Sequence, residues 1–128
     1  MPKFKFAKLV RDKIVDHQIA SGATPEYRVL SDDEHKTALV HKIIEEAEEL
    51  LEAAPNDMLA ELADVQQALD DLAEKHGLSR ADVAQAAQTK NDKNGAFKKG
   101  HYIESVDIPE DDKWVEYYRR NAARYPEI

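Results

Sequence analysis

The stretch that decides the fold is residues 31–76, SDDEHKTALVHKIIEEAEELLEAAPNDMLAELADVQQALDDLAEKH. It begins with Ser31-Asp32-Asp33-Glu34, a capping box in which the serine caps a helix and the glutamate three residues later reaches back to it. Apolar residues then recur at helical spacing until Pro55-Asn56, and a second helical run stops at His76-Gly77. The stretch therefore predicts one helix from Asp32 to about Ala54 and a second, capped by Asn56, that ends at His76.

Two long helices joined by one or two residues must pack as antiparallel neighbours. Three further helices are predicted outside this pair, over Leu9–Ala20, over Arg80–Asn94 and from Pro109 onward. Two short runs are strand-like and are expected to pair as a ribbon, Glu26–Leu30 and His101–Val106. We therefore expect an all-α fold, with a four-helix bundle and a minor two-strand ribbon over residues 1–108 and a C-terminal helical extension over residues 109–128.

The composition limits the function classes. The chain has 128 residues, enough for one domain, and no cysteine, which excludes disulfides and thiolate metal sites. Its formal net charge of -8 disfavours duplex nucleic acid and anionic membranes as main partners, because both bind cationic surfaces. No apolar run approaches the roughly 18 residues of a membrane span, and the first residues lack the apolar segment of a secretory signal. We therefore expect a cytoplasmic protein.

One acidic residue of the first long helix has an unusual position. At about 100° per residue, Glu46 falls within the apolar stripe formed by Leu39, Ile43 and Leu50, about 20–60° from each of them. Burial of a carboxylate in such a stripe is costly unless something compensates it. Glu49 follows three residues later, beside Glu46 on the edge that faces the core. This pair is therefore a candidate functional site.

The second long helix carries another acidic pair, Glu61 and Asp64, at the same spacing. Two carboxylate pairs on adjacent antiparallel helices can converge on one point, and an all-oxygen set of ligands suits Mg²⁺ or Mn²⁺. The alternative is a solvated, helix-favouring acidic face, which explains the neighbouring Glu45 well but explains Glu46 poorly. No histidine lies three residues after a glutamate in these helices, which disfavours a di-iron site.

Together these residues resemble the all-α nucleoside triphosphate pyrophosphatase superfamily, which contains the MazG-like and phosphoribosyl-ATP pyrophosphohydrolase-like proteins. The motif of that superfamily reads here Glu45-Glu46-Ala47-Glu48-Glu49, followed on the next helix by Glu61-Leu62-Ala63-Asp64. The resemblance extends over residues 8–106. Its other parts are similar to a subgroup predicted to remove non-canonical nucleotides: Lys8-Leu9-Val10-Arg11-Asp12-Lys13-Ile14, Tyr27-Arg28-Val29-Leu30-Ser31 and the run Lys90–Phe97, in which Gly95-Ala96-Phe97 replaces Gly-Gly-Phe.

The resemblance implies a Mg²⁺-dependent enzyme, with Mn²⁺ as an alternative metal, that hydrolyses a nucleoside triphosphate to a monophosphate and pyrophosphate. The metal ligands would be Glu46, Glu49, Glu61 and Asp64, and Glu46 would serve as a direct ligand or as the general base. The triphosphate also needs cationic and amide partners, for which the candidates are Lys8, Arg11, Lys90, Lys93 and Asn94. A single helix pair leaves an apolar face uncovered, so we also expect a homodimer or a larger homo-oligomer.

Three other functions stay open at this point. The first is a phosphoribosyl-ATP pyrophosphohydrolase, which acts on a related bond. The second is a non-catalytic helical binding module, in which the acids are surface charge and the C-terminal aromatic helix, with Trp114, is the contact surface. The third is a protein that binds divalent ions without hydrolysis. No glycine-rich phosphate loop of the Walker type is present, so a P-loop enzyme is excluded.

Overall fold

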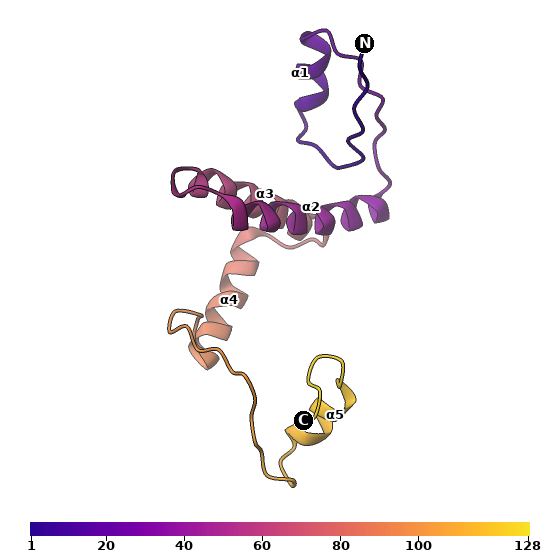
Figure 1. Cartoon of the computed structure of the whole chain (residues 1–128). Coiled ribbons are helices and arrows are strands. Elements are labelled where there is room, and N and C mark those ends of the chain that lie inside the picture. The colour runs from indigo at the N-terminus through magenta and orange to yellow at the C-terminus, as the bar shows by residue number, and fades with distance from the viewer. The chain divides into compact units, whose positions relative to one another are not determined.

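The computed structural model describes all 128 residues and is all-α, as the sequence predicts (Figure 1). Its elements are α1 (Ile14–Ala20), α2 (Asp32–Glu52), the 3₁₀ turn η1 (Pro55–Asp57), α3 (Met58–Lys75), α4 (Arg80–Asn94) and α5 (Trp114–Arg120). The chain separates into two compact units, Met1–Asn94 and Gly95–Ile128. None of the helices combines the length and the apolar character needed to cross a bilayer.

The predicted capping box is present at the start of α2. The Ser31 hydroxyl accepts a hydrogen bond from the backbone N–H of Glu34 at 3.3 Å, and the Ser31 N–H donates to Glu34 Oε1 at 3.3 Å. The Arg28 guanidinium donates to both oxygens of the same carboxylate, at 3.2 and 2.7 Å. Hydrogen bonds from Arg28 and Ser31 lower the pKa of Glu34 to about 2. The N-terminus of α2 is therefore fixed by a cap and by an ion pair.

Helices α2 and α3 lie side by side as an antiparallel hairpin (Figure 1). Lys75 at the end of α3 contacts Asp32 at the start of α2, with Nζ 2.9 Å from Oδ1. Asn56 does not cap α3, because it lies within the 3₁₀ turn that leads directly into the helix. The hairpin is the part of the fold that brings the two acidic pairs together.

The end of α3 has the predicted glycine stop. Gly77 has a φ of 71°, which favours glycine because it has no Cβ. Its N–H donates to the carbonyl of Glu74 and the N–H of Leu78 donates to the carbonyl of Ala73, both at 2.9 Å. These two bonds form a Schellman motif, which satisfies the last carbonyls of the helix.

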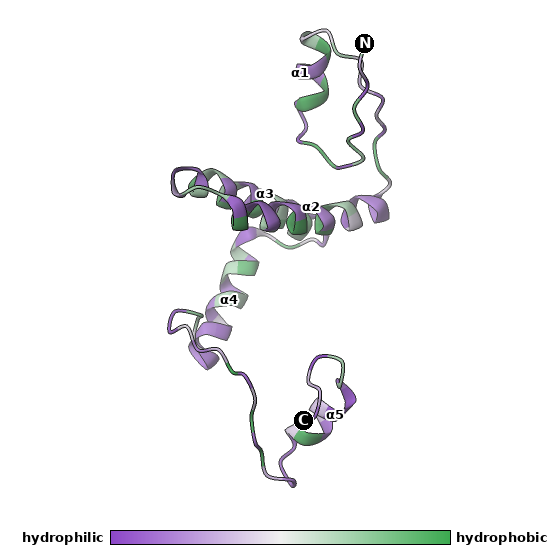
Figure 2. Ribbon diagram, in the orientation of Figure 1, coloured by the Kyte–Doolittle hydropathy of each residue, from purple (hydrophilic) through white to green (hydrophobic).

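Few residues are fully buried in the hairpin. The core consists of Leu39 and Ala68, and the third buried residue is Glu46. Other apolar residues of α2 and α3 remain about half exposed, among them Ile44 and Leu62. Figure 2 shows hydrophobic residues interspersed with hydrophilic ones along both helices. One copy of the hairpin therefore leaves much of its apolar surface uncovered.

The predicted two-strand ribbon is wrong, because the structure contains no strand. Glu26–Leu30 and His101–Val106 belong to different compact units, and most of their apolar side chains are exposed: Val29 is 91% exposed and Ile103 is 76% exposed. A two-stranded pair needs a hydrophobic face packed on something else to be stable. The β-propensity of these two runs is therefore not enough to form strands, because neither run has such a packed face.

Two helices begin later than the sequence predicts. Helix α1 begins at Ile14 rather than Leu9, and residues 8–11 are not helical. Helix α5 begins at Trp114, whereas Pro109 begins a turn in which its carbonyl accepts from the Asp112 N–H at 2.9 Å. The boundary between the two compact units falls at the end of α4, where Gly95 has a φ of 83°.

Candidate metal centre

The Glu46 carboxylate is the centre of the site. Its residue is 7% exposed, on the face of α2 that packs against α3, as its place in the apolar stripe predicts. Oε2 is buried and has no hydrogen-bond partner, while Oε1 lies 3.4 Å from the Lys42 ammonium. Burial, followed by the nearby Glu49 carboxylate, raises the pKa of Glu46. A buried carboxylate oxygen without a partner is destabilising unless a cation or a proton compensates it.

Glu46 belongs to two groups of acidic side chains. In each group, one oxygen per carboxylate lies within 4.8 Å of the others; the groups are Glu45, Glu46, Glu49 and Glu46, Glu61, Asp64. Oxygens around an octahedral Mg²⁺ are about 3–4.2 Å apart, so the side chains of either group would move closer together to bind the ion. Glu61 adds a second buried oxygen, Oε2, that has no partner. The donor set therefore fits a hard divalent cation.

The four predicted ligands differ in their exposure. Glu46 is buried and Glu61 is half-buried, whereas Glu49 is exposed and the Asp64 side chain is 36% exposed. Glu45, the weaker candidate from the sequence, is half-buried and lies in the first group. The acids thus form an open site at one face of the hairpin, with a buried carboxylate at its base.

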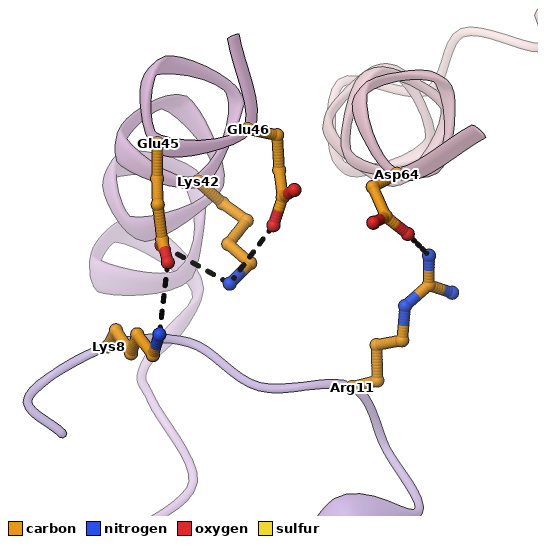
Figure 3. A network of polar contacts seen from close by, with 6 residues as sticks. All are labelled: Lys8, Arg11, Lys42, Glu45, Glu46 and Asp64. Carbon is orange, nitrogen blue, oxygen red and sulfur yellow. Dashed lines mark hydrogen bonds and ion pairs between the residues drawn. The ribbon is translucent and has the colours of Figure 1, made fainter. Parts of the chain in front are cut away.

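Two cationic residues that precede α1 reach the acids (Figure 3). Lys8 Nζ lies 3.1 Å from Glu45 Oε1 on α2, and Arg11 Nη2 lies 2.6 Å from Asp64 Oδ1 on α3. These residues were predicted as phosphate-binding groups, and the structure places both beside the carboxylates. The segment of residues 8–11 therefore contacts both helices of the hairpin.

Sequence reasoning missed Lys42. Its ammonium lies 3.2 Å from Glu45 Oε2 and 3.4 Å from Glu46 Oε1, and its side chain is only 19% exposed. Burial opposes ionisation of Glu45, but hydrogen bonds from Lys8 and Lys42 outweigh this effect, so the pKa of Glu45 is lowered. The signal was the i, i+4 spacing from Lys42 to Glu46, which puts the two on the same helix face.

The other predicted substrate-binding residues lie at the end of α4. Lys90, Lys93 and Asn94 are exposed, and no hydrogen bond or ion pair joins them to the acidic groups. The structure therefore brings Lys8 and Arg11 to the carboxylates and does not bring these three.

Fold and site together define an all-α protein in which two antiparallel helices carry a cluster of acidic side chains, one of which, Glu46, is buried. An uncharacterized protein of Mycolicibacterium smegmatis is 49% identical over 55 residues, which are 43% of this chain and 56% of that protein. The matched part thus spans little more than half the length of that relative. No protein-family model matches the chain, and no solved structure matches it.

Proposed function

We propose that this protein is a Mg²⁺-dependent nucleotide pyrophosphohydrolase that converts a nucleoside triphosphate to a monophosphate and pyrophosphate. The observation that carries the proposal is the Glu46 carboxylate, which is buried, lacks a partner at Oε2 and is shared by two acidic groups. A carboxylate kept in this environment costs stability, and binding of a divalent cation would offset that cost. The arrangement supports a metal site better than a solvated acidic face.

The proposed residues have distinct roles. Glu46, Glu49, Glu61 and Asp64 would hold Mg²⁺, with Mn²⁺ as a substitute, and the ion when bound would supply Lewis acidity at the phosphate oxygens. Glu46 would serve either as one of these ligands or, when the other three hold the ion, as the general base that accepts a proton from the attacking water. The water oxygen then bonds to the α-phosphorus, the bond from that phosphorus to the bridging oxygen breaks, and pyrophosphate leaves.

Cationic side chains would position the triphosphate. Lys8 and Arg11 are the best supported, because each already lies beside an acid of the site and is exposed enough to rotate toward a phosphate. Lys90, Lys93 and Asn94 stay in the proposal through the sequence resemblance. House-cleaning of non-canonical nucleotides is the role that this resemblance favours.

We also propose that the protein is a homodimer in which the α2–α3 hairpins of two copies pack together; this bundle of two copies differs from the four-helix bundle that the sequence predicts within one chain. The support is the apolar surface that one hairpin leaves uncovered, including Ile44, which is 51% exposed. Light scattering should then give twice the chain mass of 14.5 kDa, and Ile44→Glu should give the monomer. Val83→Glu is the matched control, because Val83 is 48% exposed but lies on α4. A monomeric wild-type protein would contradict this assembly.

The activity is tested by pyrophosphate release from a panel of canonical and modified nucleoside triphosphates, with Mg²⁺, with Mn²⁺ and with a chelator. We expect metal-dependent release that Glu46→Gln abolishes. Glu48→Gln is the matched control, because it makes the same change at an exposed position of α2 and should leave release unchanged.

The outcomes separate the proposed function from its alternatives. Absence of release from every triphosphate, with the fold intact, would refute the proposal. Release from phosphoribosyl-ATP alone would then identify the related pyrophosphohydrolase. Metal binding without turnover of any nucleotide would instead identify a protein that binds ions, and the absence of both would leave a binding module.

A further inference from the structure

Lys42 differs from the other lysines that form ion pairs. Its side chain is 19% exposed, whereas the side chain of Lys36, on the same helix, is 31% exposed and that of Lys8 is 46% exposed. The Lys42 ammonium points between Glu45 and Glu46 (Figure 3). A largely buried lysine normally needs such a pair, because its charge is costly to desolvate.

The position of this ammonium conflicts with metal binding by the same carboxylate. Lys42 Nζ lies 3.4 Å from Glu46 Oε1, the oxygen that belongs to the residue shared by both acidic groups. A divalent cation on Glu46 would carry two positive charges to within a few ångströms of the ammonium, and charges of like sign repel strongly at that separation. Lys42 must therefore either weaken metal binding or move away from Glu46.

The Lys42 side chain can move its ammonium to another position. Its flexible four-carbon stem and three rotatable donors allow the ammonium to leave Glu46 without moving the helix. The phosphate oxygens of a nucleotide bound through the metal would lie near these same carboxylates, and they are strong acceptors for an ammonium. The Lys42 ammonium, which competes with the metal in the free protein, would thus become a hydrogen-bond donor to the phosphate.

We propose that Lys42 is a positioning residue that exchanges partners. Its ammonium pairs with Glu45 and Glu46, leaves Glu46 when a divalent cation binds there, and then donates to a phosphate oxygen of the metal-bound ligand. The first half concerns metal affinity alone. The second half rests on the proposed function, because it takes the ligand to be a polyphosphate.

The test measures binding rather than turnover. Isothermal titration calorimetry with Mg²⁺ alone compares the wild-type protein with Lys42→Met, Lys42→Arg and the matched control Lys36→Met, whose lysine pairs with Asp32 on the same helix at 3.3 Å. We expect Lys42→Met to bind Mg²⁺ about tenfold more tightly, because one positive charge near the ligands is removed. The Mg²⁺ affinities of Lys36→Met and Lys42→Arg should stay close to that of the wild-type protein.

A second titration uses inorganic pyrophosphate at saturating Mg²⁺. Here Lys42→Met should bind pyrophosphate about tenfold more weakly, since a charged donor is lost, and Lys42→Arg should restore most of the affinity. A merely structural role for Lys42 would shift both titrations in the same direction. Circular dichroism establishes that each variant is folded.

Each other result overturns the inference. Unchanged or weaker Mg²⁺ binding by Lys42→Met would show that the ammonium does not compete with the metal. The proposed function would still stand in that case, provided that the wild-type protein binds Mg²⁺. Tighter Mg²⁺ binding with unchanged pyrophosphate binding would refute the exchange of partners. A wild-type protein that bound neither Mg²⁺ nor Mn²⁺ would refute the inference and the proposed function together.

Discussion

Replacement of Glu46 by glutamine tests the central claim, because it should reverse the order of stability when Mg²⁺ is added. Glu46 is 7% exposed and its Oε2 has no partner. Glutamine has almost the same shape but no charge, and its amide can donate to the neighbouring Glu49 or Glu61. The variant therefore relieves the buried charge while it removes one of the proposed metal ligands.

The magnitudes follow from the contacts. A buried charged oxygen without a partner costs about 2 kcal/mol, and loss of the ion pair with Lys42 costs about 1 kcal/mol, since that lysine keeps Glu45 as a partner. Without Mg²⁺, Glu46→Gln should thus be about 1 kcal/mol more stable than wild type. At a Mg²⁺ concentration tenfold above the dissociation constant, the wild-type protein gains about 1.4 kcal/mol and the variant gains little.

Thermal unfolding followed by circular dichroism, in chelator and in Mg²⁺, measures both effects. A difference of 1 kcal/mol shifts the Tm of a protein of 128 residues by about 3–5 °C. Glu48→Gln is the control, with an expected change within about 0.5 kcal/mol under both conditions, because the residue is exposed. The reasoning about the buried carboxylate would be wrong if Glu46→Gln had a lower Tm than wild type in chelator. It would also be wrong if Mg²⁺ raised the Tm of both proteins equally.

Three further predictions concern the scaffold. Leu39→Ala should cost about 2–4 kcal/mol in urea unfolding, because Leu39 is the most buried side chain of the hairpin; a loss below 1 kcal/mol would contradict its place in the core. The pKa of Glu34 is about 2, so its stabilising contribution is complete above its usual value of 4.5 and is lost as the pH falls toward 2. Glu34→Gln should therefore flatten the pH dependence of the Tm in that range, and an unchanged slope would contradict the assignment. Gly77→Ala should cost about 1–2 kcal/mol because of its positive φ, measured by the same unfolding assay, and a neutral effect would argue against the left-handed stop.

The hairpin was predictable because its signals are local. The capping box at Ser31 and the glycine stop at Gly77 each depend on a few adjacent residues, and the structure confirms both. Burial of Glu46 was also predictable, because helical periodicity fixes which side chains share a face. Asn56 was assigned the wrong role, since the sequence does not distinguish a helix cap from a short 3₁₀ turn that continues into the helix.

The features that depend on distant residues were not predictable in the same way. Helix α1 was expected to begin at Leu9, but Lys8 and Arg11 pair with acids 37 and 53 residues away, and residues 8–11 lie outside the helix. The ribbon failed for a related reason, because β-pairing needs a partner and a packed face that no local pattern supplies. Lys42 was overlooked because the periodicity argument was applied to the acids alone.

The short connection between α2 and α3 has a consequence for folding kinetics. Glu49 and Glu61 are separated by eleven residues and one 3₁₀ turn, so their helices meet through contacts of low sequence separation. The entropy lost in closing such a loop is small, and proteins rich in local contacts fold in microseconds to milliseconds. The acidic group is therefore assembled in the step that closes the hairpin. This step involves only residues of Met1–Asn94, so we expect the carboxylates to come together without the unit Gly95–Ile128.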